Sequence, residues 1–344
     1  MAEKLVYGIQ QVGIGVIDAQ EAMHWYAKTL GAMIKVFDDN SEATEMAPYM
    51  GGMPHQKRAI MTLNPAGGGG FELWQYLDRE PQNGSSFTPG DLGINHIKVK
   101  TRDASASSTK LRKNSVKVLS EIRTDPEGFR YFYIQDLYGN QIQITEFPSW
   151  YSTHQDTFGG VCGCAIGVSN MERSLPFYAE LLGYKHVSYD QTVEENGIKL
   201  RKVKLKSSVH SNGRFGAFLG DSWIELIQRL DQTPQAIFSD RHWGDLGFIH
   251  LCFDVYNMDQ WIRECDINGY PFRVISKDSF LMGDTNSRWG YIEDPDGTLI
   301  EMVETQRIPI LKFFNWYNNL LEKDPHKPLP RWLTSALSLK KIKA

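Results

Sequence analysis

Apolar and polar residues alternate along the segment 247–255, which predicts a β-strand with two chemically different faces. The apolar residues share one face, so His250 lies on the opposite one. A turn at 294–297 precedes a second predicted strand, in which Glu301 stands between two apolar neighbours. A histidine and a glutamate that face inward from two strands suit a pair of metal ligands.

The same unit of opening strand, helix and closing strands recurs four times along the chain. In the first copy, the spacing of apolar residues predicts a helix over 18–30, and Gly31 stands where a helix C-cap is expected. The turn at 136–139 in the second copy matches the turn before Glu301. The first and third copies are longer than the other two, which indicates that a two-unit domain was duplicated. The copies span 8–80, 91–147, 160–230 and 246–305.

This duplication predicts two domains, at 1–150 and 151–305, which meet in a polar and aromatic segment near 148–160. The tail that follows, 306–344, is aromatic and then basic. Its apolar spacing predicts a helix that packs on the body of the protein.

Each copy offers one side chain from its opening strand and one from its closing strand at matching positions. Glycine has no side chain that could bind a metal, so at least one combination of these positions is incomplete. In chain order, the pairs are Gln11 and Glu72, His96 and Gln143, Gly163 and Glu225, and His250 and Glu301.

Charge and cysteine content narrow the classes of function. A net charge of −4 over 344 residues gives no basic surface for nucleic acid. The chain has neither an apolar run of about 18 residues nor a signal-peptide pattern at its start. Its four cysteines lack the spacing of a zinc site or of a disulfide framework. We therefore expect a cytoplasmic protein with reduced core thiols and with neither nucleic-acid nor membrane partners.

The repeated motifs resemble the vicinal oxygen chelate superfamily, which includes glyoxalase I, methylmalonyl-CoA epimerase and the extradiol dioxygenases. The resemblance rests on two opening strands with their helices, GIGVIDAQEAMHWYAKTLGA and AIGVSNMERSLPFYAELLGY, and on the closing strands FELWQY and DPDGTLIEM. It implies an α+β fold of four βαβββ modules that form two domains, in which paired modules curve around a divalent metal. It also implies reactions that pass through a metal-bound enolate or a similar oxyanion.

The resemblance leaves two ways to pair the modules. Adjacent pairing would divide the ligands into one set of Gln11, Glu72, His96 and Gln143 and another of Glu225, His250 and Glu301. Outer pairing would give one set of Gln11, Glu72, His250 and Glu301 and leave His96, Gln143, Glu225 and Gly163. We favour the outer pairing, because it yields the Gln, Glu, His, Glu set that the family uses in some glyoxalase I enzymes. Such a set accepts Zn²⁺, Ni²⁺, Co²⁺, Mn²⁺ or Fe²⁺ and does not choose among them.

These ligands predict proton-transfer chemistry. A metal that binds adjacent oxygens of a substrate acidifies the carbon next to the carbonyl, and a carboxylate can then move the proton. Glu301 and Glu72 are the candidates for this base. The stretches 38–58 and 276–287 are candidates for closing the site. Charge compensation or the binding of an anionic substrate is expected of Lys98, Lys100, Arg201 and Arg214.

The sequence thus predicts a divalent-metal-dependent isomerase or epimerase, or a glyoxalase-type lyase, that acts on a small-molecule carbonyl substrate. One alternative is an extradiol-type Fe(II) dioxygenase, which is disfavoured because Gly163 stands at its first histidine position. A metal-free small-molecule-binding protein is the other alternative, which Gly163 and Gln143 keep open. Four modules in one chain can build what smaller relatives build by dimerising, so we expect a monomer or a homodimer.

Overall fold

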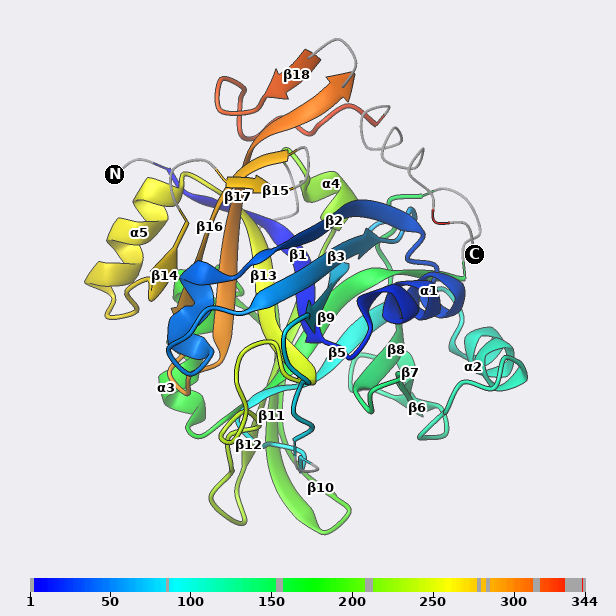
Figure 1. Cartoon of the computed structure of the whole chain (residues 1–344). Helices are drawn as coiled ribbons and strands as arrows, with labels where there is room; N and C mark the ends of the chain where they lie inside the picture. Colours follow the sequence, from blue (N-terminus) through cyan, green and yellow to red (C-terminus); the bar gives the residue numbers. More distant parts are fainter. Residues whose placement is uncertain are drawn as a thin grey trace.

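Four copies of a strand–helix–strand–strand–strand module build the chain (Figure 1). In each copy the first strand pairs in parallel with the last, and the middle strands continue the sheet outward. This arrangement confirms the predicted α+β fold of βαβββ modules. The computed structural model describes residues 3–84, 87–152, 157–207, 213–276, 280–282, 285–311, 316–331 and 342.

The first sheet combines the first and fourth modules. Their opening strands, β1 (Leu5–Gly15) and β13 (Gly247–Tyr256), pair antiparallel at its centre, which confirms the outer pairing of modules. In Figure 1 these strands are blue and yellow and lie side by side. The other strands are β14 (Val274–Ile275), β16 (Thr285–Glu293) and β17 (Leu299–Leu311) beside β13, β4 (Gly70–Tyr76), β3 (Gln56–Leu63) and β2 (Ile34–Glu42) beside β1, and the additions β15 (Phe280–Met282) and β18 (Trp316–Asn319).

The second sheet combines the second and third modules in the same strand order. Its central pair is β5 (Gly93–Thr101) and β9 (Phe158–Val168), again antiparallel. Each sheet therefore contains one module from each half of the chain. The division of the chain into two duplicated halves near residue 150 stays a prediction. The remaining strands are β8 (Gln141–Glu146), β7 (Arg130–Gln135) and β6 (Arg123–Thr124) beside β5, and β12 (Trp223–Arg229), β11 (Ile198–Lys206) and β10 (His186–Glu195) beside β9.

A capped helix follows the opening strand of each module. The side chain of Asp18 accepts backbone hydrogen bonds at the start of α1 (Ala19–Leu30), and Gly31 ends this helix with a φ of 74°. The helix predicted over 18–30 is therefore confirmed. The other helices are η1 (Thr44–Tyr49), α2 (Ala104–Lys113), α3 (Met171–Pro176) with its continuation η2 (Phe177–Leu181), α4 (Gly216–Leu219) and α5 (Met258–Ile267).

One large apolar core joins the helices to the outward faces of both sheets. The opening strands contribute residues such as Ile14, Ile97, Ile166 and Phe253, all of them buried. Because side chains alternate along a strand, the neighbours of these residues point to the opposite faces, here called the inner faces. The two inner faces are where the predicted ligand positions lie.

The tail does not form the predicted helix over its described residues. β17 continues into it as far as Leu311, and β18 pairs antiparallel with β17. The prediction was wrong there because Ile308 and Ile310 are β-branched, and because Pro309 lacks the backbone N–H that a helix interior needs. Residues 312–315, 332–341 and 343–344 of the tail lie outside the described residues.

Two expectations from composition meet different outcomes. All four cysteines are buried and free, as predicted for reduced core thiols. In the part of the chain that the structure describes, no helix is both long and apolar enough to cross a membrane. The cytoplasmic location stays a prediction.

Candidate metal centre

Four side chains that the outer pairing predicts as one site meet on the inner face of the first sheet. Gln11 comes from β1, Glu72 from β4, His250 from β13 and Glu301 from β17. Strand register brings them together, because Gly13 of β1 pairs with Glu72 on one side and with His250 on the other. Residues far apart in the chain thus occupy adjacent strands.

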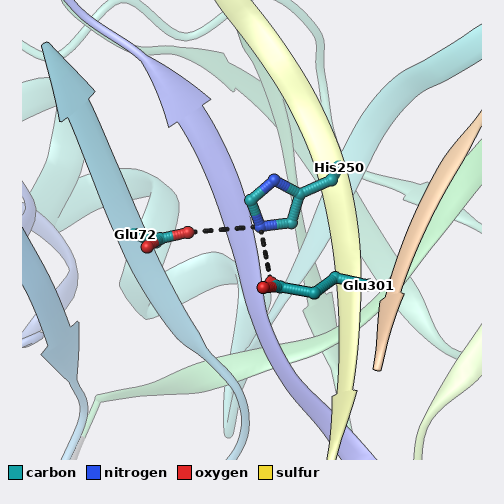
Figure 2. Close-up of side chains that lie close together, drawn as sticks. All are labelled: Glu72, His250 and Glu301. Atoms are coloured by element: carbon teal, nitrogen blue, oxygen red, sulfur yellow. Dashed lines mark ion pairs between the residues drawn. The ribbon is translucent and has the colours of Figure 1, made fainter. Parts of the chain in front are cut away.

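The imidazole of His250 lies between two carboxylates (Figure 2). Its Nε2 atom is 3.2 Å from Glu72 Oε2 and 3.1 Å from Glu301 Oε2. The amide nitrogen of Gln11 donates to the same two oxygens, at 3.1 and 3.3 Å. Ligand atoms of the histidine and both glutamates lie within 4.8 Å of one another. All four predicted side chains therefore converge on one point.

Burial makes the charge of this cluster costly. Gln11 and His250 are fully buried, and Glu72 and Glu301 are nearly so. Burial alone would lower the pKa of His250, but the carboxylates of Glu301 and Glu72 outweigh it and raise the pKa to about 9. Even with a protonated histidine, the two carboxylates leave an excess negative charge away from water, which is unfavourable. A divalent cation beside a neutral imidazole would balance both carboxylates.

The spacing of the donor atoms fits a shared ion. Bonds of about 2.0–2.2 Å from nitrogen and oxygen to an ion such as Zn²⁺ separate neighbouring ligand atoms by roughly 3–3.5 Å. The distances from His250 Nε2 to the carboxylates, 3.1 and 3.2 Å, fall in this range. Within the described residues, the buried Gln11 Oε1 and His250 Nε2 have no hydrogen-bond partner of good geometry. The cluster thus fits a divalent metal by charge, by spacing and by its unsatisfied donor atoms.

Gly13 gives the imidazole its place on the sheet. A Cβ atom at this position would overlap the ring of His250. Because the glycine has no side chain, the imidazole can lie over β1 and reach the point between Glu72 and Glu301.

Aromatic residues enclose the imidazole. The ring of Trp243 is nearly parallel to it, with 6.1 Å between centroids and an interplanar angle of 11°. Tyr291 meets it edge-on, with 5.4 Å between centroids. The backbone of Trp243 is anchored, since its N–H donates to the carbonyl of Tyr49 and its carbonyl accepts from the hydroxyl of Tyr76. These contacts keep water away from the cluster.

The second sheet brings the leftover positions together in the same register, but a lysine fills their centre. Lys98 Nζ donates to Gln143 Oε1 and to Glu225 Oε2, at 2.6 Å in each case. Lys98 on β5 and Cys252 on β13 occupy equivalent positions. Lys98 pairs with Gln143, and Cys252 pairs with the equivalent closing-strand residue, Glu301. Burial alone would raise the pKa of Glu225, but Lys98 and then Lys202 hold it below its ordinary value.

Unlike His250, His96 forms no ion pair with a carboxylate among the described residues. Its ring meets Tyr133 edge-on, with 5.1 Å between centroids. Burial, followed by the charge of Lys98, lowers the pKa of His96 well below its ordinary value, so the imidazole is neutral. Gly163 contributes no side chain at all. The leftover set therefore lacks the converging ligands of the first sheet.

The basic residues predicted to compensate charge do not pair with Glu72 or Glu301 among the described residues. Compensation of the cluster by them was a wrong expectation, because strand register directs the two lysines to the second sheet. Their role toward an anionic substrate stays a prediction. Their partners are Glu225 for Lys98, the Ser149 carbonyl for Lys100, Asp190 and Glu172 for Arg201, and the Leu320 carbonyl for Arg214.

The two stretches predicted to close the site have different outcomes. The stretch 38–58 contains the end of β2, the helix η1 and the start of β3, and the carbonyl of Tyr49 within it anchors Trp243. The stretch 276–287 lies partly outside the described residues. Closure by either one stays a prediction.

Sequence reasoning missed Gly13, Trp243 and Tyr291. A glycine inside a strand often marks a close approach of another group, which is a signal for Gly13. The triplet Asp-Leu-Gly precedes both His250 and His96, at 245–247 and 91–93, and so marks the segment of Trp243. Tyr291 faces Glu301 only through the pairing of β16 with β17, which the sequence does not report.

A family model described as the Glyoxalase/Bleomycin resistance protein/Dioxygenase superfamily matches residues 8–144 and 162–302. These two stretches make up most of the chain and contain all four residues of the cluster.

Solved structures share the fold at low sequence identity. Glyoxalase I from Zea mays matches with a TM-score of 0.56 and 14% identity, over 88% of this chain and 92% of that one. A Bacillus subtilis protein provisionally described as a dioxygenase matches with a TM-score of 0.58 and 15% identity, over 88% and 86%. At these identities the likeness concerns the fold alone.

One curated relative matches part of the chain. The uncharacterized protein YwbC of Bacillus subtilis is 40% identical over 64 residues, which is 18% of this chain and 51% of that protein. The chain thus spans about half the length of the curated relative it matches.

Proposed function

Because this chain belongs to the Glyoxalase/Bleomycin resistance protein/Dioxygenase superfamily, we propose that it is a divalent-metal-dependent isomerase or epimerase that moves a proton next to a carbonyl group. The observation that carries the proposal is the convergence of Glu72, His250 and Glu301 on one buried point, with Gln11 bonded to both carboxylates. In a structural ion cluster the charges would be balanced, whereas this one has two carboxylates against one imidazole.

In this proposal, Gln11, Glu72, His250 and Glu301 hold one ion of Zn²⁺, Ni²⁺, Co²⁺, Mn²⁺ or Fe²⁺, as in the set predicted from the sequence. When bound, the ion supplies a Lewis acid that polarises a carbonyl oxygen and acidifies the adjacent C–H group. Nitrogen and carboxylate oxygen donors of this kind suit any of these metals.

Glu301 is the proposed base that accepts the proton and returns it, with Glu72 as the second candidate. Glu301 Oε2 already lies beside His250 Nε2 and the amide of Gln11, which fix its direction. Burial and the charge of Glu301 raise the pKa of Tyr291 well above its ordinary value, so this phenol stays protonated next to the carboxylates. Burial strengthens the electrostatic effect of each of these groups.

Exchange of a substrate proton with solvent tests the proposal. The protein, loaded with each metal in turn, is incubated in D₂O with hydroxyacetone and other small α-hydroxy ketones, and deuterium incorporation is followed by NMR. Loss of the base in Glu301→Gln should slow incorporation by about 10²–10⁴-fold. Glu293→Gln, an isosteric change on β16 outside the cluster, should leave the rate unchanged.

Two outcomes would contradict the proposal. Equal exchange by the wild type and Glu301→Gln would remove Glu301 from the chemistry. Oxygen consumption with a catechol and no exchange with any ketone would instead assign ring-cleaving chemistry to the site.

A further inference from the structure

A cavity of about 380 Å³ opens on the inner face of the second sheet. Lys98, Gln143 and Glu225 line it, so it lies at the counterpart of the metal centre. Pockets that hold small molecules typically enclose roughly 300–1,000 Å³. The cavity is therefore large enough for a small ligand.

The ammonium of Lys98 stands where an ion would otherwise gather its ligands. It is within 2.6 Å of both Gln143 Oε1 and Glu225 Oε2, and its side chain is only 4% exposed. A metal ion at this point would meet a buried positive charge in place of a ligand. A ligand of this cavity must bind without a metal.

Charges around the cavity are balanced, with three lysines and three carboxylates in its lining. Each lysine already has a carboxylate partner, and separating a buried pair leaves an uncompensated charge. An ionic ligand would add a charge that no unpaired group of the lining balances, whereas an uncharged ligand would not. The pairs are Lys98 with Glu225 at 2.6 Å, Lys202 with Glu195 at 2.6 Å, and Lys204 with Asp125 at 2.8 Å.

Several polar groups of the lining are free to bind a ligand. Among the described residues, the hydroxyls of Tyr131 and Tyr133 and the side-chain amide of Gln191 have no hydrogen-bond partner, and all three residues line the cavity. Lys98 uses two of its three N–H donors on Gln143 and Glu225. Such a mixture of donors and acceptors beside tyrosine rings suits a molecule that carries many hydroxyls on a compact carbon skeleton.

The cavity lining includes Trp223 but has no tryptophan at the position that corresponds to Trp243. Asp91, Leu92 and Gly93 before β5 repeat the Asp-Leu-Gly triplet before β13. In the second module, Pro89 stands two residues before the aspartate. In the fourth module, Trp243 occupies the same position. A proline has no large ring that could extend over the inner face, so this position leaves the cavity uncovered.

We propose that the second sheet is a metal-independent binding site for an uncharged polyhydroxylated small molecule, such as a monosaccharide or a cyclitol. The site is distinct from the metal centre, and the proposal does not rest on the proposed activity. Tyr131, Tyr133 and Gln191 bind the hydroxyls, and Lys98 takes the place of a metal by donating its remaining N–H to a ligand oxygen.

Ligand-observed NMR and calorimetric titration of the full chain test this site. The neutral probes are D-glucose, D-xylose and myo-inositol, and D-gluconate and D-glucosamine are size-matched charged probes. We expect at least one neutral probe to bind with equal affinity in the presence and absence of a chelator. We also expect the charged probes to bind at least about tenfold more weakly, because each brings a charge that the balanced lining leaves unpaired.

Variants locate the binding. Tyr131→Phe combined with Tyr133→Phe keeps both rings and removes both hydroxyls, so affinity should fall by about tenfold or more. His250→Ala, which changes the metal centre, should bind the neutral probe as the wild type does. In Glu195→Gln, Lys202 loses its carboxylate partner, and binding of D-gluconate should become stronger.

Any of four results would overturn the proposal. They are no binding by any neutral probe, loss of binding with the chelator or in His250→Ala, unchanged affinity in the double tyrosine variant, and tighter binding of D-gluconate than of the neutral probes by the wild type. Far-ultraviolet circular dichroism of each variant verifies that it is folded.

Discussion

The two sheets have the same strand order and hold different chemical groups at matching positions. Both keep a histidine on one opening strand and a glutamate on one closing strand. In the first sheet a cluster of excess negative charge results, and in the second a neutral ion pair. The differing positions, first sheet before second, are Gln11 and Gly163, Gly13 and Ala165, Cys252 and Lys98, and Glu301 and Gln143.

Two of these differences concern residues outside the set of converging ligands. Cys252 leaves the centre of the first sheet open, whereas Lys98 fills the centre of the second with a cation. Gly13 lets the imidazole lie across β1, whereas a methyl group stands at the matching Ala165. A shared pair of His and Glu therefore makes a metal site only under two conditions. The neighbouring residues must leave a negative charge for the ion to balance, and they must leave space for the ion.

The largest effect should come from breaking the ion pair of the second sheet. In Lys98→Met, the buried Glu225 loses its cation, and the free energy of unfolding should fall by about 3–5 kcal/mol. Urea denaturation of the metal-free protein measures this. Lys98→Met combined with Glu225→Gln should recover most of the loss, because no unpaired charge remains.

A surface pair serves as the control for this prediction. Arg201 pairs with Asp190, and both side chains are partly exposed. Arg201→Met should cost no more than about 1 kcal/mol. If Lys98→Met were equally mild, the buried pair would not be what neutralises the second sheet.

A smaller effect is expected from exchanging the small residues of the two opening strands. Gly13→Ala forces a methyl group against the imidazole of His250, which should cost about 1–3 kcal/mol of stability and weaken metal binding. Ala165→Gly, the matched change in the second sheet, should cost about 0.5–1 kcal/mol and leave metal binding unchanged. Urea denaturation and metal titration of both variants measure these effects. Equal metal affinity in Gly13→Ala and the wild type would contradict the role given to this glycine.

The smallest effects concern pH, and they have opposite signs in the two sheets. The pKa of Glu225 is held below its ordinary value, so its pair stabilises the fold above about pH 4.5 and loses this contribution as pH falls. The pKa of His250 is raised to about 9, so without metal its ion pairs stabilise fully below about pH 6.5 and lose this contribution as pH rises through 9.

Each group should change the free energy of unfolding by at most about 1.4 kcal/mol per pH unit. Urea midpoints of the chelated protein from pH 3 to 10 measure the slopes. Lys98→Met combined with Glu225→Gln should flatten only the acid limb, and His250→Ala only the alkaline one. The reverse pattern would contradict the charge states given to the two centres.

The sequence predicted the modules because they depend on local repeats. The outer pairing and the four converging residues were predicted through the resemblance to a family with that set of ligands. Alternation around His250 and Glu301, and the capping signals of α1, are visible within a few residues. Contacts between strands of different modules are not. The positions of Trp243 and Tyr291 over the imidazole, and of Lys98 between Gln143 and Glu225, depend on register across long stretches of chain.

The predicted tail helix shows a second limit of local patterns. Its apolar spacing is compatible with either element, and pairing with the far end of β17, residues 307–311, decides in favour of a strand. The substrate depends on side chains from several loops around the site, whose joint arrangement no single segment records.

Metal content per chain tests the difference between the sheets most directly. Elemental analysis of reconstituted wild type, His250→Ala and His96→Ala should find about one ion per chain in the wild type and in His96→Ala, and almost none in His250→Ala. Loss of the ion in His96→Ala but not in His250→Ala would contradict the assignment of the metal to the first sheet. Absence of metal from all three proteins would contradict the metal centre itself.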